Sequence, residues 1–179
     1  MVKWLPYFIE MTGLLVWLKS LLPRLSKLTR WQMLTLISAA VYLIVVGYLT
    51  LAPTSYAFVT DQEVAPLMVG TAPVNLVPFW STTADFYQNV VMMLPMGVYI
   101  GLMVPRFNWR GVVVAGGLIS IAIETMQFFL DLTVGLSRWV DINDVITNTL
   151  GVLVGWLILK LLAATILKTV IEKLTIHSI

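Results

Sequence analysis

The segment ETMQFFLDLTVGLSRWVDINDVITNTLGVLVG, residues 124–155, sets how the rest of this chain must be arranged. It places isolated polar residues among long apolar runs. Four of the nine acidic residues of the chain lie in it, together with one arginine. The polar residues that stand out are Glu124, Gln127, Asp131, Arg138, Asp141, Asp144 and Asn148.

Their spacing predicts polar stripes on helices. The first three residues are spaced i, i+3, i+7, which places them on one helix face. The last three follow the same rule, and their stripe continues as Gly151 and Gly155, a GxxxG pair that lets another helix approach closely. Asp85 and Asn89 form an i, i+4 pair on a further apolar segment. We therefore expect three helices to bring polar stripes to the same membrane face.

The composition is that of a membrane protein. Of the 179 residues, 59% are hydrophobic and 11% are charged, and the mean hydropathy is +0.92. A soluble domain has about 25% charged residues. There is no cysteine, which excludes disulfide frameworks, thiolate zinc sites and cysteine nucleophiles. The composition therefore predicts an all-α integral membrane protein.

Four segments are long and apolar enough to cross a bilayer, which takes roughly 20 residues each. We expect spans at residues 32–52, 85–104, 111–130 and about 144–167. Residues 4–22 are apolar but interrupted by Pro6, Glu10 and Lys19, which predicts an amphipathic helix lying in the interface; a short or tilted span is the competing interpretation. The predicted organisation is an N-terminal interfacial helix and basic segment (1–30), a four-helix membrane domain (31–167) and a cytoplasmic tail (168–179).

The sequence also gives predictions for the long loop, the second span and the tail. The loop 53–84 contains four prolines, which predict an ordered loop over the membrane edge. Pro95 and Gly97 are expected to kink the second span. His177 is interpreted as a solvated residue of the tail.

Basic residues give the sidedness, because they collect on the cytoplasmic side of a membrane. With four spans, ten of the eleven lysines and arginines fall on one side, and Arg138 alone falls on the other. This predicts a multi-pass protein of the cytoplasmic membrane with both termini inside and the polar stripes facing outward. If residues 4–22 also cross, only Lys3 changes side. Nucleic acid is excluded as a partner because the basic residues flank spans.

Several chemistries fit the polar residues. Arg138 either clamps the outer ends of the third and fourth spans through the acids or also meets an anionic group such as a lipid phosphate. Asp141 and Asp144 have a spacing that suits Mg²⁺ or Ca²⁺, although no dedicated metal motif is present, so no cofactor is expected and a divalent metal is the alternative. Glu124, Asp141 and Asp144 are the candidates for acid–base catalysis. No serine has a histidine to activate it.

The ordered set of motifs resembles the VanZ-like family of bacterial membrane proteins over about residues 41–160. The motifs are NLVPF at 75–79, Asn89 with Pro95 and Gly97, Glu124 with Gln127, and the run from Arg138 to Gly155. The family takes its name from a protein linked to low-level resistance to teicoplanin, a lipoglycopeptide. The resemblance implies a cytoplasmic-membrane protein of Gram-positive-type bacteria acting at the cell envelope. The residues of this chain that match the family's motifs are Asn75, Pro78, Phe79, Asn89, Glu124, Gln127, Arg138, Asp141, Asp144 and Asn148.

Three functions follow as hypotheses. The favoured one is a binding protein whose outward polar site takes an envelope lipid, a cell-wall precursor or the lipoglycopeptide itself, and so contributes to resistance or envelope homeostasis. The second is a membrane-embedded enzyme that modifies a lipid-linked envelope substrate with carboxylates, either alone or together with a divalent metal. The third is a structural or assembly protein whose polar residues only tie helices together. Conservative replacement of the acids separates the first two.

Overall fold

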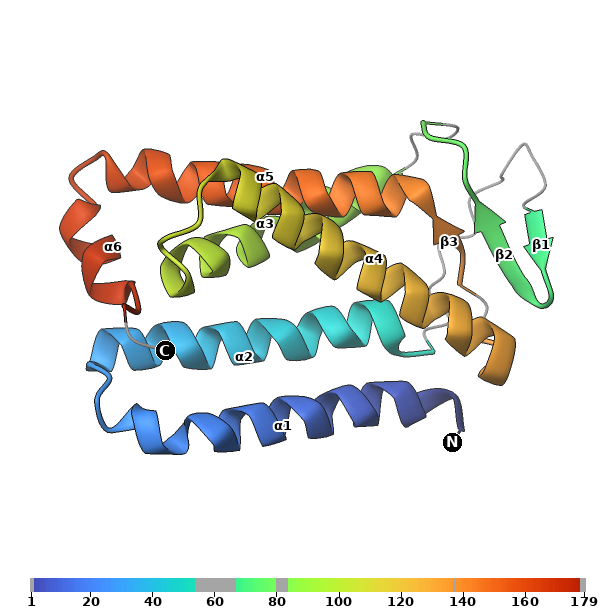
Figure 1. Ribbon diagram of the computed structural model, residues 1–179, viewed down its shortest axis with the longest axis horizontal. Helices are drawn as coiled ribbons and strands as arrows, with labels where there is room; N and C mark the ends of the chain where they lie inside the picture. The colour runs from blue at the N-terminus through green and yellow to red at the C-terminus, as the bar shows by residue number, and fades with distance from the viewer. Residues whose placement is uncertain (1, 54–66, 80–83, 137, 178–179) are drawn as a thin grey trace.

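Four long apolar helices form the body of the protein (Figure 1). The computed structural model describes residues 2–53, 67–79, 84–136 and 138–177. The helices long and apolar enough to cross a membrane are α2 (Arg30–Leu51), α3 (Ala84–Met103), α4 (Trp109–Val134) and α5 (Ile142–Ala163). They confirm the all-α membrane fold, and α5 ends at Ala163 rather than near Leu167 as expected.

Local sequence signals set the helix ends. Thr29 and Gln32 form a capping box at the start of α2, in which each side chain accepts the other residue's backbone N–H. Asn108 caps α4 by accepting the N–H of Gly111 at 3.0 Å. Gly135 ends α4 in the left-handed region, with φ 61°, which glycine adopts without a steric penalty.

Helices α3 and α5 make the closest contact of the bundle, through glycines on both. A Cβ added to Gly155 would overlap the carbonyl oxygen of Leu94, and one added to Gly97 would overlap the carbonyl oxygen of Val152. The expected close approach at the GxxxG pair is therefore confirmed, and Gly97 belongs to the same contact. The kink expected at Pro95 stays a prediction; Pro95 lies inside α3. Met93, Val112 and Val152 form the buried core beside this contact.

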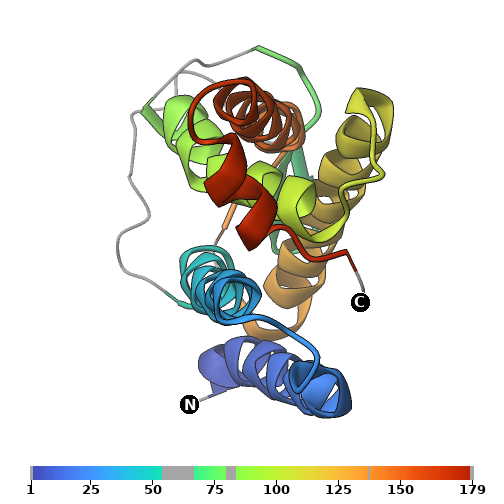
Figure 2. The same ribbon diagram turned by 90° about the vertical axis from the view of Figure 1, so that its left-hand side faces the viewer.

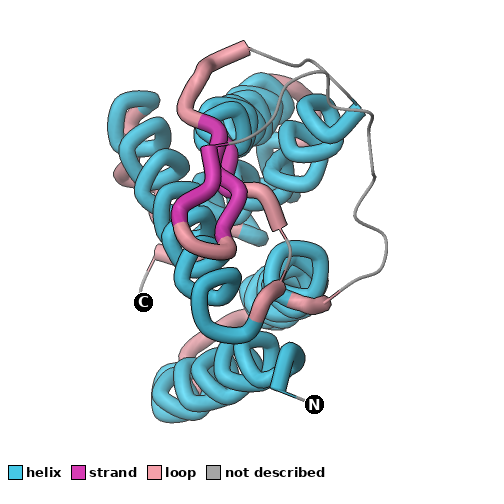
Figure 3. The backbone as a smooth tube through the Cα atoms, turned by 90° about the vertical axis from the view of Figure 1, so that its right-hand side faces the viewer, coloured by secondary structure: helices cyan, strands magenta, loops and turns pink. Residues whose placement is uncertain are grey.

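A small three-stranded sheet lies across one end of the bundle (Figure 3). Strands β1 (Leu67–Val69) and β2 (Ala72–Asn75) are antiparallel, and β2 pairs in parallel with β3 (Val140–Asp141). The expected ordered loop is thus a hairpin over the part that the structure describes. The parallel pairing places Asn75 opposite Asp141.

Helix α1 (Leu5–Leu25), preceded by a 3-10 turn (Val2–Trp4), lies side by side with α2 (Figures 1 and 2). The rings of Trp4 and Tyr7 approach Tyr48, near the end of α2, with centroids 6.2 and 6.0 Å apart. The carboxylate of Glu10 lies where a Cβ of Gly47 would be. The predicted helix is present and its axis follows α2, but it is not among the helices long and apolar enough to cross a membrane. Its position in the interface, or as a short or tilted span, stays a prediction. Its first residues lie at the sheet end of the bundle.

The tail folds back on the opposite end. Helix α6 (Lys168–Leu174) is held by α2, whose Thr35 hydroxyl donates to the carbonyl oxygen of Leu174 at 2.8 Å. The backbone N–H of Ile176 donates to the carbonyl oxygen of Leu102 at 2.8 Å. The predicted tail therefore packs against the membrane domain, while His177 is exposed as expected.

Candidate functional site

A cluster of polar side chains lies inside the sheet end of the bundle, and we call it the polar cluster. It draws on β2, α3, α4, the segment between α4 and α5, β3 and α5. Its members are Asn75, Asn89, Ser120, Glu124, Gln127, Asp131, Arg138, Asp141, Asn143, Asp144 and Asn148.

The carboxylate of Asp141 connects three elements of the cluster. Its Oδ1 accepts the side-chain amide of Asn75 at 2.9 Å and the backbone N–H of Asn143 at 2.8 Å. The second bond caps α5, because Asp141 is its N-cap residue. The backbone N–H of Asp141 in turn donates to Oε2 of Glu124 at 3.0 Å. One residue thus joins the sheet, α4 and α5.

A second set of bonds runs inward between α3, α4 and α5. The Asn89 side chain donates to Oδ1 of Asp144 at 2.6 Å. The hydroxyl of Ser120 donates to the backbone carbonyl of Asp144 at 3.2 Å, and the amide of Asn148 donates to that hydroxyl at 3.0 Å. Ser120 and Asn148 are almost fully buried, so these bonds replace the water that the groups lose inside the bundle.

Gln127 and Arg138 tie the end of α2 to the cluster. The Gln127 amide donates to the carbonyl oxygen of Thr50 at 3.0 Å, and the Arg138 guanidinium donates to the carbonyl oxygen of Ala52 at 3.2 Å. The backbone N–H of Arg138 donates to Oδ1 of Asp131 at 3.2 Å. The Arg138 side chain therefore contacts the end of α2, which the clamp interpretation did not include.

The charges outside the spans respond to burial. Burial lowers the pKa of the Arg138 guanidinium, and the acids Asp131, Asp144 and Glu124 oppose that change. Burial raises the pKa of the Asp141 carboxyl, and the hydrogen bonds from Asn143 and Asn75 oppose the rise. Arg138 thus lies in an electronegative setting.

Two buried amide oxygens of the cluster have no hydrogen-bond partner among the described residues. They are Oε1 of Gln127 and Oδ1 of Asn148, in side chains 5% and 2% exposed. Buried polar atoms are normally paired, and leaving one unpaired costs roughly 1–3 kcal/mol. Each of these two oxygens can therefore accept a further hydrogen bond.

The structure brings all eight predicted ligand-binding residues into this hydrogen-bonded cluster. Of the two other carried-over residues, Pro78 lies in the exposed turn after β2, and Phe79 donates its backbone N–H to Oδ1 of Asn143 at 2.7 Å. The Asp85 side chain lies outside the described residues. Within the part of the chain that the structure describes, no three acidic or histidine side chains are grouped so that they could hold a metal ion.

The sequence did not identify Ser120 and Asn143 as members of the polar cluster. Ser120 lies four residues before Glu124, so it continues the stripe of α4 and the same spacing rule would have found it. No spacing rule identifies Asn143, because its side chain accepts the backbone N–H of Phe79. That bond depends on the turn at Phe79, whose positive φ of 59° is not predictable from the sequence pattern.

Four spanning helices and a polar cluster enclosed at one end define a multi-pass membrane protein with a built polar site. The model of the VanZ/LLP1 family matches residues 39–163, and the chain belongs to this family. The match begins within α2 and stops at the end of α5, so it contains the whole polar cluster and leaves out α1 and α6. Comparisons with curated proteins and with solved structures gave no match.

Proposed function

We propose that the polar cluster binds the head group of an envelope lipid, a cell-wall precursor or a lipoglycopeptide, and that the protein thereby contributes to glycopeptide resistance or envelope homeostasis. Membership of the VanZ/LLP1 family supports the link to resistance. The observation that carries the binding role is the excess of acceptors. The cluster contains four carboxylates but one guanidinium, on which Asp131, Asp144 and Glu124 act, and two of its buried amide oxygens lack a partner among the described residues.

This excess selects the chemistry of the ligand. Carboxylate and amide oxygens accept hydrogen bonds, so they match hydroxyl and ammonium groups. A phosphate alone would meet more negative than positive charge at this cluster, because the guanidinium of Arg138 already contacts the backbone of α2 and faces three acids. The ligand class is therefore a sugar or an amine-bearing peptide, presented on a lipid or lipopeptide.

The distribution of lysine and arginine supports an outward position for the cluster, in the cytoplasmic membrane. The basic residues that follow α1, α3 and α5 lie at the end of the bundle opposite the sheet. That end, with the C-terminus, is the cytoplasmic one in this proposal. The acceptor-rich end then faces the side on which cell-wall precursors and lipoglycopeptides are found.

Conservative replacements test binding against catalysis. E124Q and D144N keep an acceptor oxygen but remove the carboxylic acid. We expect them to retain teicoplanin resistance within about twofold, whereas E124A and R138A lose it, because alanine leaves buried partners unpaired. The measurement is the inhibitory concentration of teicoplanin for cells that express each variant at equal levels, with E172Q on exposed α6 as the matched control.

An acid–base enzyme predicts the opposite pattern. E124Q and D144N would then abolish function, and mass spectra of envelope lipids would differ between cells with and without the protein. Loss of yield and thermal stability in R138A with unaltered resistance per folded molecule would favour the purely structural role.

Single cysteines test the orientation, and the chain has no native cysteine to remove. We expect a membrane-impermeant maleimide to label V69C on exposed β1 in intact cells and to label K173C only after permeabilisation. K3C separates the two interpretations of α1. The packing of α1 along α2 supports labelling from outside, whereas the interfacial helix with both termini cytoplasmic predicts protection. Labelling of K173C but not V69C in intact cells would contradict the outward cluster.

A further inference from the structure

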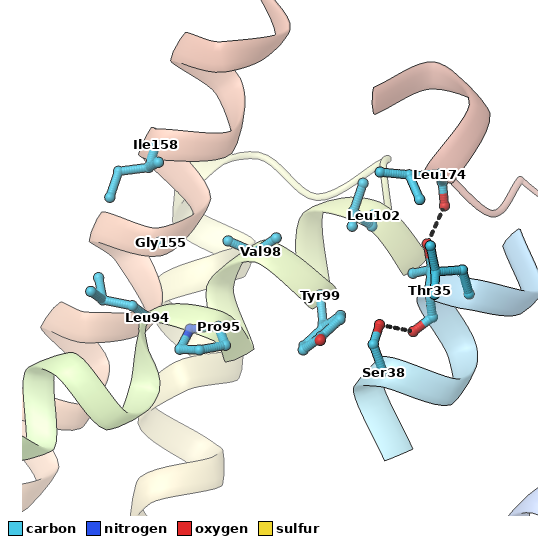
Figure 4. A pocket seen from close by; sticks show the side chains of 11 residues that line it. Thr35, Ser38, Leu94, Pro95, Val98, Tyr99, Leu102, Gly155, Ile158 and Leu174 are labelled. Atoms are coloured by element: carbon cyan, nitrogen blue, oxygen red, sulfur yellow. Dashed lines mark hydrogen bonds between the residues drawn. The ribbon is translucent and has the colours of Figure 1, made fainter. Parts of the chain in front are cut away.

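An apolar groove of about 520 Å³ lies away from the polar cluster, between α2, α3, α5 and α6 (Figure 4). Its volume falls in the range of ligand pockets, roughly 300–1,000 Å³. Helix α3 forms much of its wall, and residues from α2, α5 and α6 complete it. The lining residues include Leu34, Leu94, Val98, Leu102, Ile158 and Leu174.

The tail closes one end of this groove. Leu174 of α6 belongs to the lining, and its carbonyl oxygen accepts the hydroxyl of Thr35. The carbonyl oxygen of the next residue, Thr175, accepts the amide of Gln32 at 3.0 Å. These bonds fix α6 beside the first turns of α2, which distinguishes the groove from an ordinary furrow between lipid-facing helices.

Exposed cations flank the closed end. Arg30 is the first residue of α2 and shares a helix face with the lining residue Leu34, four positions on, and Lys173 directly precedes the lining residue Leu174. Lys27 lies on the connection before α2 and is also exposed. Glu172 is the one acid of α6, and it pairs with Lys168 at 3.9 Å rather than with Lys173. An apolar slot therefore lies near cations for which the described part of the chain shows no ion pair.

We propose that this groove binds one acyl chain of an anionic phospholipid whose head-group phosphate contacts Arg30 and Lys173. The apolar lining matches the chain, and the cations match the phosphate and its net negative charge. The site is independent of the polar cluster, because the two share no residue and lie at different ends of the bundle. It selects a lipid of the leaflet on the side of the C-terminus.

The test uses the full-length protein in nanodiscs containing equal amounts of phosphatidylglycerol and phosphatidylcholine. Native mass spectrometry after release counts the lipids retained per protein. We expect one phosphatidylglycerol to be retained in preference to phosphatidylcholine. Each cation near an anionic surface contributes about fivefold in affinity, so R30Q/K173Q should lower the retained phosphatidylglycerol about 25-fold. R106Q/R110Q makes the same change of net charge at the connection between α3 and α4 and in the first turn of α4, and it should leave retention unaltered.

Filling the groove tests the acyl chain separately. V98W places an indole in the slot and should reduce retention at least tenfold, whereas V114W, on an exposed face of α4, should not. L34W fills the groove from α2 and replaces V98W if that variant does not fold. Equal retention of both phospholipids by the parent protein, or full retention of phosphatidylglycerol by the folded tryptophan variant, would overturn the proposal. Neither outcome bears on teicoplanin resistance, which tests the polar cluster.

Discussion

Replacement of Gly155 by alanine is expected to destabilise the protein by about 3 kcal/mol or more, at the upper end of the range for overpacking. The added Cβ would overlap the carbonyl oxygen of Leu94 and would lie 2.8 Å from its carbonyl carbon and 3.1 Å from its Cα. These atoms are backbone inside α3, so no side-chain rotation relieves the overlap. Helices α3 and α5 must separate, and that separation opens the buried core at Met93 and Val152.

The matched control is Gly117→Ala in α4. A Cβ at Gly117 has only the Thr149 hydroxyl within 4 Å, at 3.8 Å, which is ordinary contact. Alanine should therefore stabilise this helix by roughly 0.5–1 kcal/mol, because it restricts the unfolded chain more than glycine does. The measurement is the midpoint of unfolding in mixed detergent micelles as the fraction of SDS rises. Equal shifts for the two variants would contradict the close approach at Gly155.

The sequence predicted this contact because a GxxxG pair in an apolar segment has a direct physical meaning. It also predicted the number of spans, since a bilayer imposes a minimum length on an apolar helix. The VanZ/LLP1 family model matches residues 39–163, which include all of the ordered motifs, and this match confirms the resemblance.

The sheet and the two terminal helices were harder to predict. Strands of two to four residues carry too few positions for an alternating pattern, and β3 forms only because α4 and α5 bring Val140 beside Val74. The orientation of α1 depends on its packing against α2, where Gly47 leaves room for Glu10. The fold of the tail depends on carbonyl groups at Leu174 and Thr175, and backbone acceptors leave no trace in a sequence.

The polar cluster was predictable in its membership but not in its bonds. The i, i+3, i+7 spacing placed Glu124, Gln127 and Asp131 on one face, and all three are buried. The pairing of Asn75 with Asp141 joins residues 66 positions apart. It follows from the register of β2 on β3, which only the assembled sheet supplies. The set of acceptors on which the proposed function depends likewise follows from which residues the fold brings together.

Asp141→Ala is expected to destabilise the protein by about 2–4 kcal/mol. It removes the N-cap of α5, which contributes about 1 kcal/mol, and leaves the amide of Asn75 without its carboxylate, at a cost of roughly 1–3 kcal/mol. Asn75 is only 6% exposed, so water does not readily replace that bond. SDS titration measures the loss, and N75A should produce most of the same effect, because either change breaks one shared bond.

Asp141→Asn separates the hydrogen bonds of this residue from its charge. An amide oxygen still accepts from Asn143 and Asn75, so the cap and the link to the sheet survive. Burial raises the pKa of the Asp141 carboxyl, which means that the folded protein disfavours its charged form, and the neutral amide avoids that cost. D141N should therefore remain within about 1 kcal/mol of the parent near neutral pH. A loss as large as that of D141A would instead assign the stabilisation to the charge of Asp141.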